Sequence, residues 1–227
     1  PKVGIAGAPN DLAIRSPKRV GWGLCDRLSG TGSQIVPKIT VMSGATELGD
    51  WAHQVSSPQA VLMSYGGDVY LVTGGRRSKI DLADKPVTLA LGIQVGAVTP
   101  SPMSRAMYES LIPTAPLRVP EIPAPGGPVG YSSAMLPLVS GSVIRAASVS
   151  GERTYFVALP AGVQSVPETV AVMVTNANVS GQAKVWETDA ATIAALPQAI
   201  GFEVGMYPQA RVELLDKDDE PVTCVMW

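Results

Sequence analysis

His53 is the one histidine in the chain, so a Ser-His-Asp or Cys-His catalytic site would have to include it. No G-x-S-x-G segment, the sharp turn that exposes a nucleophilic serine, occurs in the sequence. The neighbouring residues Trp51–Gln54 are typical of a loop or a strand edge. A lone histidine also makes a zinc site improbable. The sequence therefore predicts a structural or exposed histidine, no catalytic residues and no metal site.

Phosphate binding by a P-loop needs the pattern G-x-x-x-x-G-K-[ST], whose backbone amides and lysine hold the phosphates. No Gly-Lys pair occurs anywhere in the chain. The glycine pairs 21/23 and 30/32 have the G-x-G spacing of a dinucleotide site, but Asp26 and Ile35 stand where the third glycine belongs. We therefore expect these glycines in turns, and we predict no cofactor.

Four carboxylates lie in the segment Asp216–Glu220 and could attract calcium. The central glycine and the terminal bidentate glutamate of an EF-hand loop are absent from this segment. The sequence favours a solvated tip of a hairpin whose strands are residues 211–215 and 222–227.

A cationic group, Arg76, Arg77 and Lys79, lies on a predicted strand. Guanidinium and ammonium groups could bind an anionic wall polymer or the carboxylates of a partner protein. An exposed strand face explains the same charges equally well. The group is thus a candidate ligand or partner surface, and both interpretations stay open.

Cys25 and Cys224 are the only cysteines, and neither belongs to a C-x-x-C pair that would indicate zinc or thioredoxin-like chemistry. Trp22 and Trp227 each lie three residues from one of them, which suggests that the two ends of the chain meet in one packed apolar layer. A disulfide there would close a loop of 199 residues. The chain-entropy model gives such a bond roughly 5 kcal/mol, and an intact bond implies an oxidising compartment. Two unrelated buried thiols are the alternative.

Composition narrows the class of protein further. The formal charge is −2 and no stretch is dense in lysine and arginine, so nucleic-acid binding is not expected. No run of about 18 apolar residues that could span a bilayer is present. The chain has no signal-peptide pattern and begins at Pro1 without a methionine, so we expect a piece of a longer protein. The scattered 20 prolines and 23 glycines favour many short elements joined by turns.

Those elements form a repeat. Strands are expected at residues 60–65, 68–73 and 76–82, joined by Gly66-Gly67 and Gly74-Gly75, because paired glycines allow the positive φ angles of tight hairpin turns. Strands at 142–149, 153–159 and 163–166 repeat this order, and Tyr70–Val72 aligns with Tyr155–Val157 at an offset of 85 residues.

The repeat continues into helices. Short helices are expected at 84–91 and 167–174, and further ones at 101–112 and 188–196, each of the latter ended by a proline. Their expected starts are Ser101-Pro102 and Thr188-Asp189. Four ordered elements at nearly constant offset indicate a duplicated module.

The remaining segments lie outside the repeat. Residues 113–128 hold six prolines and two glycines and are predicted to form an extended linker. Strands are expected at 35–42, 200–207, 211–215 and 222–227 in a separate sheet. The predicted fold is α+β and β-rich, with two β-hairpin-plus-helix modules flanking part of a central β-sheet or barrel domain. The predicted division is 1–58 (central β-domain part), 59–113 (module), 114–141 (Pro/Gly-rich linker), 142–198 (module) and 199–227 (central strands).

Several segments together resemble the EccB family, core components of the mycobacterial type VII (ESX) secretion systems. They are VGIAGAPNDL (3–12), WGLCDR (22–27), YLVTGGRRSKIDL (70–82), DKPVTLALGI (84–93), SLIPTAPL (110–117) and EPVTCVMW (220–227). The resemblance implies four modules around a central β-domain, of which this chain holds two. It also implies that Cys25 and Cys224 form the family's disulfide.

The resemblance further implies a non-catalytic structural subunit on the periplasmic side of the inner membrane, anchored by a transmembrane helix outside this segment. Its expected partners are copies of itself and other membrane components of the secretion complex. One alternative is a module that anchors the protein to peptidoglycan. The other is a nucleotide hydrolase, because the family has been linked to ATPase activity, although no motif for it is present.

Overall fold

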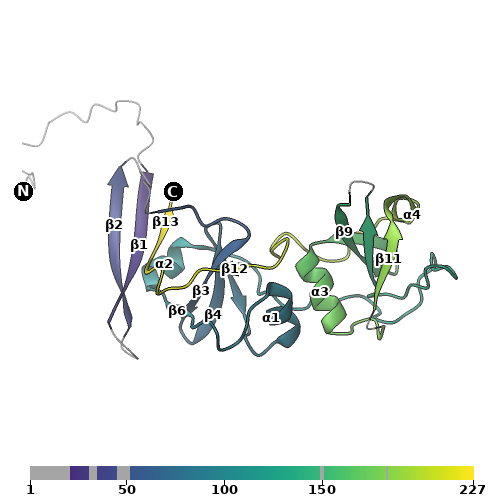
Figure 1. The fold of residues 1–227 in the computed structure, drawn as a ribbon, viewed down its shortest axis with the longest axis horizontal. Coiled ribbons are helices and arrows are strands. Elements are labelled where there is room, and N and C mark those ends of the chain that lie inside the picture. Colours follow the sequence, from purple (N-terminus) through teal and green to yellow (C-terminus); the bar gives the residue numbers. More distant parts are fainter. Residues whose placement is uncertain (1–20, 31–34, 45–51, 149–150, 183) are drawn as a thin grey trace, which may run out of the picture.

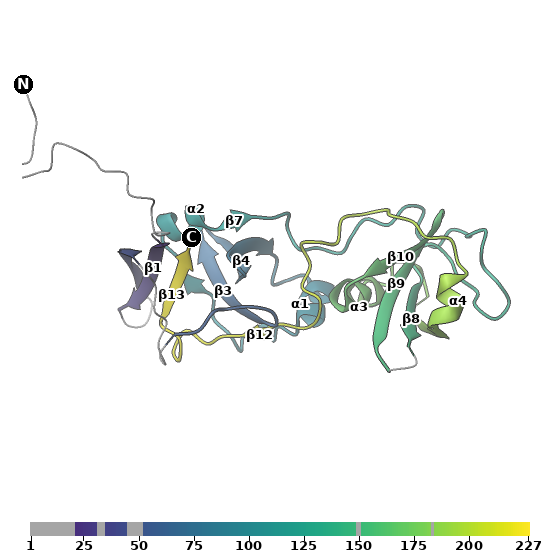
Figure 2. The same ribbon diagram turned by 90° about the horizontal axis from the view of Figure 1, so that it is seen from above.

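The computed structural model describes residues 21–30, 35–44, 52–148, 151–182 and 184–227. Three sheets follow one another along an elongated molecule, and the C-terminus lies beside the first strand at one end (Figure 1). All three sheets are open within the described residues, and short helices cover them (Figure 2). The predicted α+β, β-rich class is confirmed, with several open sheets in place of a barrel, the first of them at one end of the molecule (Figure 1).

The first sheet, which we call the disulfide sheet, is antiparallel and has the order β13-β1-β2. Its strands are β1 (Gly21–Ser29), β2 (Val36–Gly44) and β13 (Val222–Met226). The glycine pair 21/23 therefore lies in a strand, and the expectation of a turn there was wrong. Gly23 fits because the methyl groups of Met42 and Met226 lie 3.2 and 3.3 Å from where its Cβ would be.

Module A contains a sheet of order β12-β3-β4-β5-β7, with β6 paired to β3, and two helices. Its elements are β3 (Gln59–Tyr65), β4 (Asp68–Thr73), β5 (Arg76–Ile80), α1 (Lys85–Leu91), β6 (Ser101–Pro102), α2 (Arg105–Ser110) and β7 (Ile112–Pro113), joined by β12 (Glu213–Leu214). The predicted glycine turns are present: Gly66 and Gly67 have φ of 61° and 88°, values that cost glycine little.

Module B has the sheet order β10-β9-β8-β11. Its elements are β8 (Val143–Ala147), β9 (Arg153–Leu159), β10 (Gly162–Val166), α3 (Glu168–Asn176), β11 (Val185–Asp189) and α4 (Ala190–Ala194). The pairing repeats that of module A, because β11 joins β8 in parallel as β6 joins β3. A parallel bridge from Val163 to Gln198 likewise takes the place of the β5–β7 pair. Two repeated modules are thus confirmed.

The equivalent helices α1 and α3 pack against each other between the modules (Figure 1). Their buried residues form one hydrophobic cluster that includes Val87 and Leu91 of α1 and Val170 and Met173 of α3. These four side chains are fully buried. The two modules therefore share a core.

Two helices begin later than predicted. Ser101 and Pro102 form β6, and Ser104 is the N-cap of α2, its Oγ accepting from the Met107 amide. Thr188 belongs to β11, so Asp189 alone caps α4. In both modules, residues expected at the start of the helix belong instead to a short parallel strand, β6 or β11. Their backbone groups form hydrogen bonds with the neighbouring strand, β3 or β8.

The return segment, residues 199–215, departs most from prediction. No strand forms at 200–207, where the Gln164 side chain accepts from the Gly201 amide and donates to the Phe202 carbonyl. Residues 211–215 contribute only β12, which pairs in parallel with β3 rather than joining the disulfide sheet. The carboxylate segment 216–220 consequently links two different sheets, and the predicted hairpin was wrong.

Candidate functional site

The disulfide sheet ties the two ends of the described chain together. Cys25 and Cys224 lie opposite each other on β1 and β13 and are joined by a disulfide across 199 residues of sequence. Trp22 and Trp227 exchange two backbone hydrogen bonds of 2.9 and 3.0 Å. Their side chains do not form the expected packed layer, because these residues are 47% and 64% exposed at the end of the sheet.

A buried carboxylate joins this sheet to module A. Asp26 is 1% exposed; its Oδ2 accepts from the Ser104 amide at 2.6 Å, and its Oδ1 from the Ser104 hydroxyl at 2.7 Å. Hydrogen bonds to a charged acceptor are among the stronger ones in proteins. No sequence pattern predicted this contact, since the two residues are 78 positions apart. The one available hint was Ser104 itself, a good N-cap residue.

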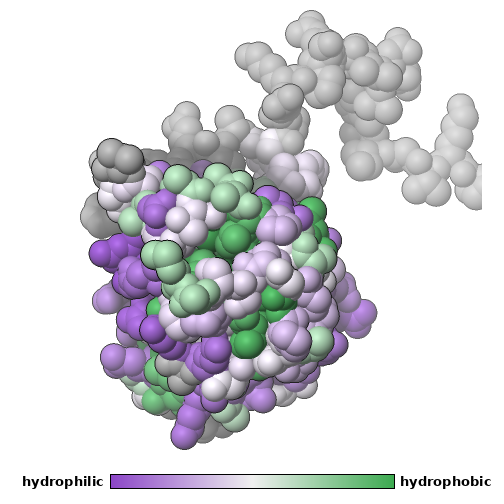
Figure 3. Space-filling view, turned by 90° about the vertical axis from the view of Figure 1, so that its right-hand side faces the viewer, coloured by the Kyte–Doolittle hydropathy of each residue, from purple (hydrophilic) through white to green (hydrophobic). Residues whose placement is uncertain are grey.

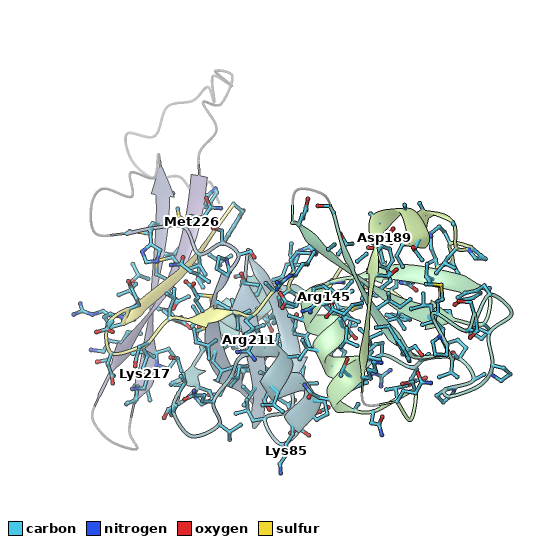
Figure 4. All side chains as sticks on the ribbon, turned by 45° about the vertical axis from the view of Figure 1, so that its right-hand side comes forward. Lys85, Arg145, Asp189, Arg211, Lys217 and Met226 are labelled. Atoms are coloured by element: carbon cyan, nitrogen blue, oxygen red, sulfur yellow. A yellow bond between two sulfur atoms is a disulfide. The ribbon has the colours of Figure 1, made fainter. Side chains whose placement is uncertain are left out.

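The disulfide sheet also carries exposed apolar side chains. Val36, Ile39, Val41 and Met42 of β2 are 42–61% exposed, and Val222 of β13 is 45% exposed. Within the described residues β2 pairs with β1 only, so its other edge has no strand partner. Met226 lies at the end of β13 in the same sheet (Figure 4). An edge strand with exposed apolar side chains is a common place for another polypeptide segment to pair with the sheet.

The candidate surface of Arg76, Arg77 and Lys79 does not form one face. Arg77 lies over the ring of Tyr108 at 3.9 Å and donates from Nε to the Tyr108 carbonyl at 2.8 Å. Lys79 forms an ion pair of 2.7 Å with Asp68. Because successive side chains of a strand point to opposite faces, Arg76 lies on the other face of the sheet from Arg77. There it lines a small cavity of about 150 Å³ beside the return segment. The three cations therefore present no continuous charged strip.

Arg77 belongs instead to an aromatic group on module A. Tyr65 stacks on Tyr108 with ring centroids 4.4 Å apart, and Tyr70 meets Tyr108 edge-on at 5.5 Å. Burial, together with the neighbouring Tyr108, raises the pKa of Tyr70 to about 12. Tyr65, Tyr70 and Arg77 all pack against the Tyr108 ring, so the group stabilises the module.

The remaining sequence candidates give no catalytic arrangement. His53 is exposed, and its one ion-pair neighbour in the described chain is Glu220, with Nδ1 and Oε1 3.9 Å apart. In the 216–220 segment, Lys217 pairs with Asp218 at 2.8 Å. Across the described residues no group of three or more His, Cys, Asp or Glu side chains is placed to hold a metal ion.

A second cavity, of about 400 Å³, lies between module B and the return segment. Its lining mixes charges, with Glu152 and Glu168 beside Arg153, and Tyr155 donates to Glu168 at 3.4 Å. The outer end of module B shows hydrophobic patches between polar ones (Figure 3).

The whole chain, residues 1–227, matches the family model described as "Type VII secretion system ESX-1, transport TM domain B". The chain belongs to the EccB family. It is 35% identical over 231 residues to a Mycobacterium tuberculosis protein named ESX-5 secretion system ATPase EccB5, covering 100% of this chain and 45% of that one. It is 34% identical over 229 residues to ESX-1 secretion system ATPase EccB1 of Mycolicibacterium smegmatis, covering 99% and 46%. The chain thus spans about half the length of these EccB relatives.

Solved EccB structures share the fold. A chain of an intact ESX-5 inner membrane complex superposes with a TM-score of 0.79 at 34% identity, covering 99% of this chain and 45% of that chain. A chain from the EccB3 dimer of the ESX-3 core complex gives 0.76 at 27% identity, covering 99% and 56%. Within the described residues, no helix is both long and apolar enough to cross a membrane.

Proposed function

We propose that this chain is a periplasmic, non-catalytic structural part of a type VII secretion complex in the inner membrane. The observation that carries the proposal is the likeness of its whole length to a chain of the intact ESX-5 inner membrane complex, with a TM-score of 0.79. Its partners are then further copies of the same protein and other membrane components of the complex. The transmembrane anchor belongs to a part of the protein outside this chain.

The internal construction suits a scaffold. The disulfide joins β1 to β13 within the first sheet, the Asp26–Ser104 contact joins that sheet to module A, and the core shared by α1 and α3 joins module A to module B. The Asp26–Ser104 contact and the shared core are buried, and buried packed contacts resist deformation more than exposed ones. A part that keeps its modules in fixed relative positions can hold partner subunits at a set spacing. Symmetric assembly is the usual outcome for a protein that lines a channel.

Assembly in membranes tests the proposal. The full-length protein, tagged and expressed from its own locus, is extracted with mild detergent and separated on native gels, and each band is identified by mass spectrometry. We expect the tagged protein in a large complex with other secretion components. If the protein runs as a free chain while the remaining components still assemble without it, the structural role is wrong.

The ATPase in the names of the relatives is tested separately. The 227 residues hold no Gly-Lys pair for a P-loop, so we expect the purified full-length protein to release no phosphate from ATP above an enzyme-free blank. The sample is purified to homogeneity and checked for contaminating ATPases by mass spectrometry. Release that co-purifies with the protein and disappears with one point substitution in this chain would overturn the non-catalytic claim.

A wall-anchoring role is the rival proposal. Arg77 and Lys79 already have partners within the chain, and Arg76 lies on the other face of the sheet. We therefore expect Arg76→Gln together with Arg77→Gln to leave peptidoglycan pull-down of the full-length protein unchanged. Retention that is strong in the native protein and lost in this variant would favour anchoring over scaffolding.

A further inference from the structure

The disulfide and the contact between the first sheet and module A lie on neighbouring residues. Cys25 and Asp26 are consecutive on β1, so their side chains point to opposite faces of the disulfide sheet. Cys25 is bonded to Cys224 on one face. Asp26 meets Ser104 of module A on the other. One short piece of β1 thus carries both links.

Helix α2 rests on the two strands that the disulfide joins. It contacts β1 and β13, and it lies between the disulfide sheet and the module A sheet (Figure 2). Leu24 of β1 and Val225 of β13 pack into the same hydrophobic cluster as Met107 of α2. The surface against which α2 packs is therefore formed by β1 and β13 together, and it depends on β13 lying beside β1.

Ser104 connects Asp26 to the first turn of helix α2. Its amide and hydroxyl both donate to Asp26, and its Oγ accepts from the Met107 amide at 3.1 Å. Ser104 is 8% exposed, so water competes little for these bonds. Losing the carboxylate would leave two buried donors without their acceptor, which is costly.

We propose that Asp26 and the Cys25–Cys224 bond form one latch that fixes module A on the disulfide sheet and opens when the bond is reduced. In that step a dithiol such as dithiothreitol gives two electrons and two protons to the two sulfurs. The products are two cysteine thiols and the cyclic disulfide of the reagent. Once free, β13 can separate from β1, which leaves β1 paired with β2 alone, and Asp26 leaves Ser104.

Hydrogen exchange of the full-length protein in its detergent-extracted complex tests the latch. Peptides covering residues 101–111 report on α2, and peptides covering 84–93 report on α1, which lies away from the disulfide sheet (Figure 1). On reduction we expect exchange at 101–111 to become about tenfold faster or more, the effect of losing hydrogen bonds to a charged group. Exchange at 84–93 should stay the same.

Asp26→Asn provides the second arm, with the disulfide intact. We expect the same local acceleration at 101–111, whereas Asp81→Asn, which changes an exposed carboxylate of module A that caps a turn, should leave 101–111 unchanged. Unchanged exchange at 101–111 after reduction of the native protein overturns the latch. So does equal acceleration of both regions, which would mean general loosening. Reduction of the native protein distinguishes these outcomes even if the Asp26→Asn variant does not fold.

Discussion

Modules A and B share one order of strands and helices but differ in what covers the sheet face opposite the shared core. In module A that face is covered by α2 and the disulfide sheet, which together bury Met63 and Val72. In module B the corresponding face is covered by α4 and by the linker. Leu136 and Leu138 of the linker pack in one cluster with Ile144 of β8. A duplicated module therefore keeps its internal pairing while its outer face adapts to the chain that lies nearest.

The N-cap residues show the same divergence. Ser104 of module A meets a carboxylate from another sheet. Asp189 of module B caps α4 by accepting from the Thr192 amide and hydroxyl, and it lies in module B, remote from the disulfide sheet (Figure 4). An aspartate at position 104 would face Asp26 directly. The choice of cap thus helps to determine which module binds the disulfide sheet.

The largest expected effect concerns what the modules have in common. Leu91→Ala removes a fully buried side chain from the shared core and should lower the free energy of unfolding by about 4 kcal/mol. Leu89→Ala, on the same helix but 53% exposed, should cost less than about 1 kcal/mol. Chemical denaturation followed by fluorescence measures both. Similar losses of unfolding free energy in the two variants would show that α1 does not contribute to a core shared by modules A and B.

A smaller effect is expected at the caps. Ser104→Asp would place two carboxylates together in a buried contact and should cost about 3 kcal/mol. Asp189→Ser exchanges one good cap for another and should change stability by about 0.5 kcal/mol or less. The same denaturation experiment compares them. If both substitutions cost equally little, the carboxylate contact does not distinguish the modules.

Tyr131 of the linker makes its side-chain hydrogen bonds to module B. Its hydroxyl donates to the Leu159 and Gly162 carbonyls and accepts from the Leu159 amide. Tyr131→Phe should cost about 2 kcal/mol, because these backbone groups lose their partner. The matched change Tyr155→Phe removes exposed contacts, among them one of 3.4 Å to Glu168, and should cost about 0.5 kcal/mol or less. A thermal melt in which both variants unfold together would contradict this.

The smallest effect is a pH dependence of the module B cap. Hydrogen bonds from the Thr192 amide and hydroxyl lower the pKa of Asp189 below its ordinary value of 3.8. A carboxyl group whose pKa is lowered by folding stabilises the folded state fully at a pH above its unfolded-state pKa. That stabilisation is lost as the pH falls through the folded-state pKa. Protection from exchange at residues 190–195, relative to the intrinsic exchange rate at each pH, should therefore fall in acid, and Asp189→Asn should remove the part of this change due to the cap. An identical acid response in both proteins would contradict it.

Local signals in the sequence predicted the repeated parts well. The Gly-Gly pairs predicted the hairpins of module A because few residues other than glycine take positive φ, and Asp84 predicted the start of α1. The return segment could not be predicted in this way. Its residues 200–207 are β-prone, but their backbone is held by the Gln164 side chain and by neighbouring loops. Nothing local in a sequence reports such partners, and the same holds for Asp26 and Ser104.

The disulfide makes a covalent ring of the chain from Cys25 to Cys224, and both modules lie inside that ring. A tensile force applied to the chain before Cys25 and after Cys224 would pass from one sulfur to the other. The hydrogen bonds and cores of the modules would carry almost none of it. The modules would therefore keep their shape under loads that reach them through the chain ends.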